Sequence, residues 1–375
     1  MSPLAEAVKN DLVRLSREIH ADPELAYQER RAASRIAALL ERNGHTVEMG
    51  VGGLETALRA RVGPAGPSVA LLAEYDALNG VGHGCGHNLI ALTNVGAFLA
   101  AAERSRDLEI GLELIGTPAE EDGGGKIDLL NAGVFDQVIA ALSTHPAAQG
   151  GWVVSGTGLG IVEKKVTYHG LASHAGSSPE RGRNALNGVI RLFLGIDAWR
   201  QHLPSDSRVH GIITHGGDAA NVIPARAEAK IALRAKDLGT LDEMVATFSD
   251  IAQGAALATS TSVDIVEYLR LYAPTRANPV LGDLLAEELR SRGVEPQRGV
   301  LVTASTDFGN VSQVAPADYI GFPVSEKSIP GHSHVMRDSS ATDLAHHNAM
   351  ITAEILAAAA VRIASDAALR ERLRA

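Results

Sequence analysis

The densest group of chemically reactive side chains lies in one short segment, Gly82-His83-Gly84-Cys85-Gly86-His87-Asn88. Its three glycines let the backbone turn tightly, and the turn presents the Cys85 thiolate and the His87 imidazole two residues apart. Both groups bind soft and borderline metal ions, so a turn that enters a helix near Asn88 can direct two ligands at one ion. Two ligands do not complete a tetrahedral site. The segment alone is therefore explained equally well as a glycine-rich turn with an inert, buried thiol.

Other potential ligands follow predicted strands or lie near the end of the sequence. They are Glu74 and Asp76 after the strand at 69–72, Glu120 and Glu121 after the strand at 108–115, His145 after the strand at 137–142, and the pair His332 and His334. Open α/β sheets bind ligands beyond the carboxyl ends of their strands, so one crevice would collect these side chains. A single surface His is usually only a surface His. Donors on several separate segments favour a metal site.

Glu120 and Glu121 are adjacent carboxylates that can take different roles beside a metal ion. One can bind the ion while the other accepts a proton from bound water. Considered in isolation, the acidic triplet at 120–122 would more often be a solvated loop. Its position after a predicted strand, with the other donors, favours the catalytic interpretation.

The pattern of apolar residues predicts the elements that must hold these side chains. Helices are predicted at 4–19, 32–41, 89–103, 279–291 and 343–363, and strands at 69–72, 108–115 and 137–142. In the first part of the chain, strands alternate with helices. This alternation predicts a largely parallel α/β sheet.

The middle of the chain has a different pattern. Its predicted elements are a strand, a helix, two strands, a helix and a strand, at 162–168, 184–201, 209–214, 225–233, 241–257 and 262–268. The order β-α-β-β-α-β is that of the split βαβ sandwich, which can fold as a unit of its own. We therefore predict an α/β protein of two domains. Residues 1–163 and 274–375 form a metal-binding catalytic domain with a mainly parallel core, and residues 164–273 form an inserted ferredoxin-like lid.

Composition limits the classes of function. The 375 residues are 45% hydrophobic and 21% charged, as in proteins with packed cores. A formal net charge of -10 without a basic tract argues against a nucleic-acid partner. The apolar stretch at 89–102 is shorter than the roughly 20 residues of a membrane span, and charge interrupts the N-terminal segment where a secretory signal needs an apolar core. With a single cysteine, these features predict a cytoplasmic protein without a membrane partner.

Seven segments spread over almost the whole chain occur in a distinctive order and spacing. They are His20-Ala21-Asp22-Pro23-Glu24-Leu25, Ala73-Glu74-Tyr75-Asp76-Ala77-Leu78, Gly84-Cys85-Gly86-His87-Asn88, Thr117-Pro118-Ala119-Glu120-Glu121, His174-Ala175-Gly176, Asn221-Val222-Ile223-Pro224 and Ser305-Thr306-Asp307-Phe308-Gly309-Asn310-Val311-Ser312. In these segments the chain resembles metallopeptidase family twenty, which contains aminoacylases and hippurate hydrolases. The resemblance is nearest to the aminobenzoyl-glutamate hydrolase and carnosine-dipeptidase-like members of that family.

The resemblance implies a set of ligands and a general base. The implied ligands are Cys85, His87, Glu121, His145 and a C-terminal His, preferably His332 with His334 as the reserve, and the implied base is Glu120. Classical di-zinc members carry His in place of Glu74 and Asp in place of Cys85. The resemblance therefore leaves open whether the site holds one ion or two. Asp76 matches an Asp that orients a ligand in those members, and support of a ligand or merely a local hydrogen bond would explain it here. Zn and Mn are the expected divalent metals.

The expected reaction is hydrolysis of the amide bond of a small N-acyl amino acid, a dipeptide or an aryl-amide such as aminobenzoyl-glutamate. A metal-activated water gives its proton to Glu120, which returns it to the leaving amine. The resemblance nominates His174 on the lid as a donor to the oxyanion, in its own subunit or in the neighbouring subunit of a homodimer formed through the lid. Asn221 and Arg234 are candidates for binding a substrate carboxylate or amide. An ordinary turn residue and a surface charge are their respective alternatives.

Two other classes of function compete with this interpretation. Cys85 and His87 would serve as nucleophile and base in a cysteine hydrolase, although no separate group that orients the base is identifiable. A catalytically silent binding homologue would share the fold, but the base and the ligand set are all present. A Rossmann dehydrogenase is disfavoured, because the glycines at 123–125 lack the spaced fingerprint and a strand directly before them.

Overall fold

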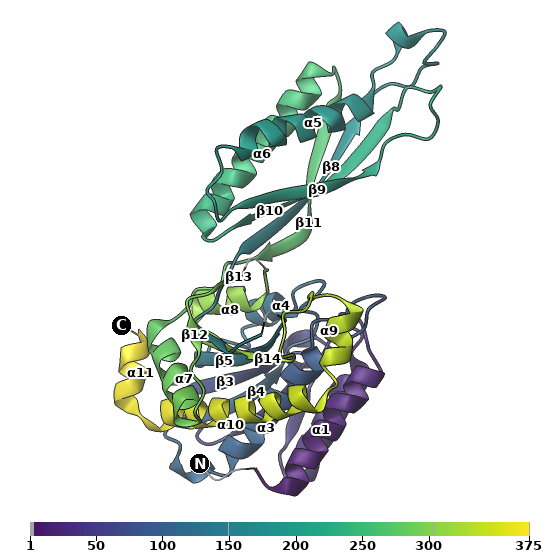
Figure 1. Cartoon of the computed structure of the whole chain (residues 1–375). Helices are drawn as coiled ribbons and strands as arrows, with labels where there is room; N and C mark the ends of the chain where they lie inside the picture. The colour runs from purple at the N-terminus through teal and green to yellow at the C-terminus, as the bar shows by residue number, and fades with distance from the viewer. Residues whose placement is uncertain (1–3, 149, 303, 375) are drawn as a thin grey trace. The chain divides into compact units, whose positions relative to one another are not determined.

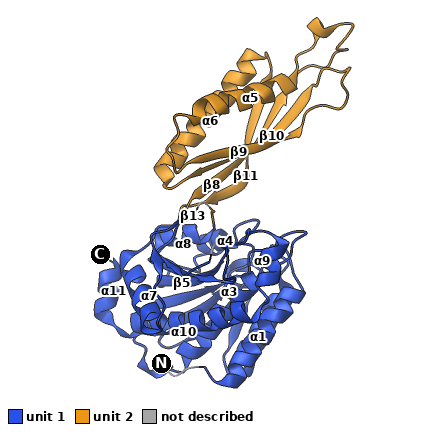
Figure 2. Cartoon of the chain, in the orientation of Figure 1, with its two compact units in different colours: residues 1–157, 275–302, 306–375 blue, residues 158–274, 303–305 orange. Residues whose placement is uncertain are grey.

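The computed structural model describes residues 4–148, 150–302 and 304–374, which fold as two compact units (Figure 2). Unit 1 comprises Met1–Thr157, Thr275–Val302 and Thr306–Ala375, and unit 2 comprises Gly158–Pro274 and Thr303–Ser305. The sequence places the insertion at 164–273. Unit 2 begins before residue 164 because its first strand starts at Gly160, earlier than the strand predicted at 162–168.

An eight-stranded sheet with the order β1-β2-β4-β3-β5-β14-β6-β12 forms the centre of unit 1. Its strands are β1 (Val47–Met49), β2 (Leu58–Val62), β3 (Ser68–Ala73), β4 (Gly111–Gly116), β5 (Val138–Ala147), β6 (Val153–Val154), β12 (Gln297–Arg298) and β14 (Ala317–Pro323). The central strands β4, β3, β5 and β14 are parallel, and antiparallel pairs flank them. The predicted α/β class with a mainly parallel core is confirmed.

The central strands bring their carboxyl ends to one edge of the sheet. All six residues of β3 and all six of β4 are buried, because helices cover parallel strands on both faces. Ala73 at the end of β3 lies opposite Gly116 at the end of β4, and Leu71 lies opposite Leu142 of β5. The segments after β3 and β4, and His145 near the end of β5, therefore meet at the same edge.

Helices surround this sheet. They are α1 (Glu6–Ala21), α2 (Arg30–Arg42), α3 (His87–Ala102), α4 (Gly125–Asn131), α7 (Pro279–Ser291), α8 (Phe308–Val314), α9 (His334–Ser339), α10 (Asp343–Ser365) and α11 (Ala367–Arg374). Every residue of α3 is buried, since it packs against β3 and β5 and against α1 and α10 (Figure 1). By length and hydropathy α10 could cross a membrane, but 67% of its apolar window is buried, as in the core helix of a folded domain.

Unit 2 is a four-stranded antiparallel sheet covered by two helices on one face (Figure 1). The strands β8 (Gly160–His169), β9 (Arg208–His215), β10 (Arg226–Ala235) and β11 (Ser262–Tyr272) have the order β11-β8-β10-β9, and the helices are α5 (Ala185–Arg200) and α6 (Leu238–Ala258). Tyr168, Leu192 and Phe248 belong to its separate hydrophobic core. The elements follow the predicted β-α-β-β-α-β order. Two short strands, β7 (Thr157–Gly158) and β13 (Leu301–Val302), pair with each other in a sheet of their own.

Candidate metal centre

The turn before α3 brings Cys85 and His87 close to the end of β5. Gly86 has a φ of 82°, in the left-handed region that glycine adopts without strain. A Cβ at Gly86 would lie only 2.8 Å from Cγ of Pro146, so the backbone conformation and the close approach both require glycine. His145 precedes Pro146, and this approach therefore gathers three of the predicted ligands.

The predicted ligands form two groups that share Cys85. Cys85, His87 and His145 form one group, Cys85, Glu121 and His332 form the other, and the ligand atoms within each group lie within 4.8 Å of one another. Sγ of Cys85 is 3.5 Å from Nε2 of His145. Nε2 of His332 is 3.7 Å from Oε2 of Glu121. Cys85 would thus be available to hold an ion in either group.

Hydrogen bonds from outside the two groups orient the histidine rings. Nδ1 of His87 lies 2.9 Å from Oδ1 of Asp76, whose Oδ2 accepts the backbone N–H of Glu121 at 2.9 Å. Nδ1 of His145 lies 2.9 Å from the carbonyl oxygen of Pro146. A proton on Nδ1 leaves the Nε2 lone pair of each ring free for an ion. Asp76 thus contacts two of the predicted ligands, the His87 ring and the backbone of Glu121.

Buried polar atoms without partners show that these residues fit a cation. Among the described residues, Nε2 of His87, Oε1 of Glu121 and Oε2 of Glu74 are buried and have no hydrogen-bond partner. Nε2 of His87 is 3.7 Å from Oε1 of Glu121, too far for a hydrogen bond. Buried polar atoms are normally satisfied, and a divalent cation held by each of the two groups would satisfy Nε2 of His87 and Oε1 of Glu121.

The environment of Cys85 suits a ligand better than a nucleophile. Burial, followed by the Glu121 carboxylate, raises the pKa of the Cys85 thiol. A nucleophilic cysteine needs a lowered pKa, which nearby positive charge normally provides. A bound metal ion keeps a coordinating thiol deprotonated even when it is buried. The place of Cys85 in both donor groups, together with the absence of a lowered pKa, therefore favours ligation over the cysteine-hydrolase alternative.

Glu120 is buried beside the two groups, with Oε2 3.8 Å from Nε2 of His87. Burial, followed by the charge of Glu74, raises the pKa of Glu120 well above its ordinary value. A general base works best with a pKa near the operating pH, and bound cations would lower this pKa again. Its burial beside the donor groups makes Glu120 the candidate proton acceptor of this site.

Two residues to which the sequence assigns no role complete the charges of the centre. Nζ of Lys126 is 2.7 Å from Oε1 of Glu74 and 2.6 Å from Oδ1 of Asp307, and all three side chains are buried. Burial lowers the pKa of Lys126, but the Asp307 and Glu74 carboxylates outweigh this effect and raise it. Glu74, His87 and Glu120 form a third group of donor atoms. The Lys126 ammonium already provides a cation at Glu74.

The glycine run at 123–125 has a packing role. A Cβ at Gly125 would lie 1.9 Å from the carbonyl oxygen of Pro118, and a Cβ at Gly123 would lie 2.4 Å from Cε2 of Tyr27. The glycines therefore let the chain fold back against the loop that carries Glu120. This explains the run without a phosphate ligand, in agreement with the missing dinucleotide fingerprint.

The structure separates the two C-terminal histidines. His332, with a φ of 52°, lies beside Glu121 and belongs to a ligand group. His334 begins α9, and its Nδ1 lies 3.0 Å from Nη1 of Arg337. Among the described residues, His334 is in none of the candidate metal groups.

The remaining predicted site residues lie in unit 2. Nδ1 of His174 accepts the backbone N–H groups of Gly176 and Ser177, both at 3.1 Å. Asn221 lies next to Val222, which forms an isolated antiparallel bridge with His174. Arg234 donates to Oγ of Ser305 at 2.8 Å and to Nε2 of His210 at 3.3 Å. Unit 2 thus brings His174 and Asn221 together, whereas Arg234 lies elsewhere on its sheet.

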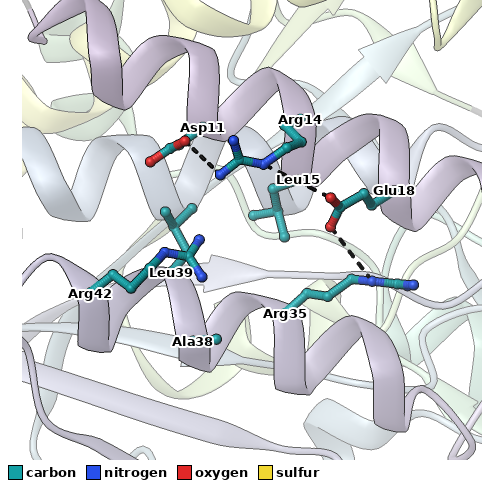
Figure 3. Close-up of a pocket in the computed structure, with 8 residues that line it drawn as sticks. All are labelled: Asp11, Arg14, Leu15, Glu18, Arg35, Ala38, Leu39 and Arg42. Carbon is teal, nitrogen blue, oxygen red and sulfur yellow. Dashed lines mark hydrogen bonds and ion pairs between the residues drawn. The ribbon is translucent and has the colours of Figure 1, made fainter.

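A pocket of about 150 Å³ lies between α1 and α2 (Figure 3). Its lining residues are Asp11, Arg14, Leu15, Glu18, Arg35, Ala38, Leu39 and Arg42. Arg14 pairs with Asp11 and Glu18, and Glu18 also pairs with Arg35. Charges across this pocket are thus largely compensated by neighbouring side chains, and none of the candidate ligands lines it.

Known proteins resemble this chain over most of its length. Residues 159–259 match the peptidase dimerisation domain of the M20 family. The chain is 35% identical to a Xaa-Arg dipeptidase of Mus musculus, over 96% of this chain and 87% of that protein. It is 34% identical to one of the subunits of the p-aminobenzoyl-glutamate hydrolase of Escherichia coli, over 69% of this chain and 58% of that protein.

Solved structures share the fold. A dinuclear metal-binding peptidase of the M20 family from Bacillus subtilis has a TM-score of 0.77 at 18% identity, covering 96% of this chain and 99% of that one. An aminobenzoyl-glutamate utilization protein from Klebsiella pneumoniae has a TM-score of 0.71 at 21% identity, covering 94% and 95%. The resemblance inferred from the seven sequence segments is confirmed. The chain belongs to the M20 family of metallopeptidases and is a metal-dependent hydrolase of amide bonds.

Proposed function

We propose that the protein hydrolyses the amide bond of a dipeptide or N-acyl amino acid at a two-ion centre, with Glu120 as the general base. One observation carries the proposal. Five donor side chains from four segments of the chain form two groups around a shared Cys85, and the buried Glu120 carboxylate lies 3.8 Å from His87 and next to Glu121 in the sequence. A centre of this kind has no evident use in binding alone, because a silent homologue would need no proton acceptor at that position.

The ions, when bound, polarise the scissile carbonyl and acidify the attacking water. Glu120 accepts the proton of that water and passes it to the leaving amine. Asp76 keeps His87 and the backbone at Glu121 in position, as its 2.9 Å hydrogen bonds indicate. Lys126 holds Glu74 in an ion pair, so Glu74 need not act as a ligand.

Zinc is the metal that the donor set favours, with manganese as the alternative. A thiolate and three imidazoles, from Cys85, His87, His145 and His332, are typical donors for a borderline ion. The sharing of Cys85 supports two ions per chain. A centre that depends on one thiolate also favours a reducing compartment, and we propose the cytoplasm.

The names of the relatives suggest the class of substrate. A dipeptide ending in Arg and aminobenzoyl-glutamate both carry a free carboxylate next to the amide that is cleaved. Asn221 and Arg234 are the candidates for binding this carboxylate. The Arg234 guanidinium donates to two neutral groups, Ser305 and His210, so a substrate anion would add a charged partner.

His174 is the proposed donor to the oxyanion. Its Nδ1 accepts two backbone N–H groups, so a neutral ring carries its proton on Nε2. The side chain lies on an exposed segment of unit 2. A protonated Nε2 is the kind of donor that stabilises a developing negative charge.

A homodimer through unit 2 is supported by an open edge of its sheet. Strand β9 lies at the end of the strand order, next to β10, and it exposes 62% of Ile212 and 47% of Ile213. Helix α5, which contacts β9, exposes 59% of Leu194 and 45% of Ile190. An edge strand beside exposed apolar side chains is a surface that a second copy can cover.

A substrate screen tests the proposed function. Purified protein, with its metal content measured, is assayed on dipeptides with basic C-terminal residues, on N-acyl amino acids and on aminobenzoyl-glutamate. We expect hydrolysis of at least one class, its loss after chelation, and its return after Zn²⁺ or Mn²⁺ is added. Hydrolysis that survives complete metal removal, or that thiol alkylation stops without any loss of metal, would support the cysteine mechanism instead.

A further inference from the structure

Two residues with a left-handed backbone share one hydrogen-bond acceptor. Tyr27 has a φ of 62° and Ala119 a φ of 60°, although neither is glycine. Both donate their backbone N–H to the same atom, Oε1 of Glu29, at 2.9 Å. Such conformations are unfavourable for residues with a Cβ and persist only where the surroundings hold them.

Both backbone polar groups of Ala119 are hydrogen-bonded. Its carbonyl oxygen accepts the N–H groups of Gly124 and Gly125, at 2.9 and 3.2 Å. With its N–H bound to Glu29, neither of its backbone polar groups is free to turn. The next residue is Glu120, so the direction of the proposed base is set by the backbone at Ala119.

The other carboxylate oxygen of Glu29 extends this network to the end of β3. Oγ1 of Thr56 donates to Oε2 of Glu29 at 2.9 Å, and the carbonyl of Thr56 accepts Oη–H of Tyr75 at 2.6 Å. Tyr75 lies between Glu74 and Asp76 in the sequence. Through these hydrogen bonds the buried Glu29 connects the segment after β3 with the segment after β4.

An ordinary structural role does not explain this carboxylate. Glu29 occupies the N-cap position of α2 but makes no side-chain cap to it. It is fully buried, and no basic side chain among the described residues forms an ion pair with it, since Arg30 and Arg31 pair with other carboxylates. Burial, followed by the charge of Asp76, raises the pKa of Glu29 to about 7. A buried carboxylate held only by neutral donors is unfavourable, which indicates that its hydrogen bonds serve a purpose.

We infer that Glu29 is a positioning residue for catalysis: it holds Ala119 in the left-handed conformation and thereby aims Glu120 at the reacting atoms. This inference rests on the proposed role of Glu120 as the general base. Glu29 touches neither the substrate nor the metal ligands in this arrangement. Its effect passes through one backbone N–H and the peptide that follows.

The first test compares three variants at equal metal content. Glu29→Ala removes the acceptor and should lower kcat by about tenfold or more with KM within about twofold, because small displacements of a catalytic group cost large factors in rate. Glu29→Gln keeps a carbonyl oxygen for the two N–H groups and should retain most of kcat. Glu24→Ala is the matched control, since the Glu24 carboxylate accepts the N–H groups of Arg31 and Ala32 of α2 and, among the described residues, has no hydrogen bond or ion pair with the loop of Glu120. It should lower stability and leave kcat nearly unchanged.

If Glu29→Ala does not fold, Glu29→Asp provides the same test, since it withdraws the carboxylate by one methylene. A fall in kcat without a matching rise in KM supports the inference. Unchanged kcat at full metal content in either variant overturns it. A fall in kcat that follows metal loss in proportion also overturns it, because the residue would then act through ligand binding.

A second test uses stability and not activity. Ala119→Gly allows the same φ at little cost. In this background, Glu29→Ala should shift the denaturation midpoint less than it does in the wild type. Equal shifts in both backgrounds would show that Glu29 does not act on the backbone at Ala119. The comparison stays valid even if Glu120→Gln retains turnover, a result that would overturn the proposed function but not the coupling of Glu29 to Ala119.

Discussion

Lys126 is the residue whose loss should disturb the buried charges of unit 1 most. Its ammonium contacts Glu74 at 2.7 Å and Asp307 at 2.6 Å, and its backbone N–H donates to the other oxygen of Asp307 at 2.9 Å. Lys126→Met keeps most of the side-chain volume and removes the charge. Two carboxylates then stay buried without the cation that served both.

The expected loss of stability comes from this arrangement of charges. Removing one partner of a buried ion pair costs about 3–5 kcal/mol, because the remaining charge is left uncompensated. One cation serves two carboxylates here, so we expect at least the lower end of that range for Lys126→Met. The pH dependence has a definite sign. Burial already raises the pKa of Asp307 to about 6 despite Lys126, and without Lys126 this pKa should rise further. The variant should therefore be more destabilised at pH 8, where both carboxylates must ionise, than at pH 5.

Urea denaturation of the chelated protein measures this effect without a contribution from metal binding. Asp307→Asn is the control, since it leaves Lys126 and Glu74 as a neutral pair. It should cost less than Lys126→Met, on the order of 1–3 kcal/mol for one imperfect buried hydrogen bond. A loss below about 1 kcal/mol for Lys126→Met, or equal losses for the two variants, would refute the reasoning about buried charge.

Three further predictions concern Cys85, His174 and Asp318, a buried residue of β14 that accepts hydrogen bonds from Ser155. Cys85→Ser should lower metal content and activity together, measured by elemental analysis and turnover, because a hydroxyl is a poor substitute for a thiolate that two ligand groups share; full metal content with no activity would instead favour a nucleophilic cysteine. His174→Ala should lower kcat about 10²-fold or more with little effect on substrate binding. Mixing it with Glu120→Gln protomers should restore some activity if His174 acts across a dimer, and no recovery despite proven subunit exchange would contradict the crossed arrangement. Burial raises the pKa of Asp318 to about 7 from 3.8, so this group destabilises the fold increasingly as pH rises through that interval, by up to about 4 kcal/mol. Asp318→Asn should therefore gain stability relative to wild type between pH 4 and pH 8 in urea titrations, and a constant difference would contradict the assignment.

Local signals are sufficient to predict many of the elements. Helix α7 begins at Pro279, after Asn278 whose side chain accepts the N–H groups of Val280 and Leu281, and the sequence predicts the same range. Such caps depend on residues adjacent in sequence. Strand β2 is absent from the predicted elements, although Leu58, Ala60 and Val62 alternate with two arginines there. That period of two is the signal that would have found it.

Glu121 and His145 could be proposed as donors because they follow strands, and parallel strands end at one edge of the sheet. For Cys85, His87 and His332 the sequence offers a glycine-rich turn, a C-terminal histidine pair and the resemblance to metallopeptidase family twenty. Lys126, Asp307 and Glu29 could not be identified in this way. Each is a common charged residue whose surface placement is the usual outcome. What distinguishes them is complete burial, which depends on packing between segments up to 181 residues apart, as for Lys126 and Asp307. The left-handed backbone at Ala119 likewise has no local signal, since alanine normally avoids it.

The central claim is that Glu120 takes the proton of a water activated at a metal centre that other residues build. Glu120→Gln isolates this claim, because it removes the proposed proton acceptor and leaves all five proposed ligand side chains in place. The decisive measurement is turnover of this variant, with its metal content determined on the same sample. We predict the metal content of the wild type and a fall in kcat of about 10²- to 10⁴-fold. Substantial turnover at full metal content would show that the base lies elsewhere and would contradict this role of Glu120.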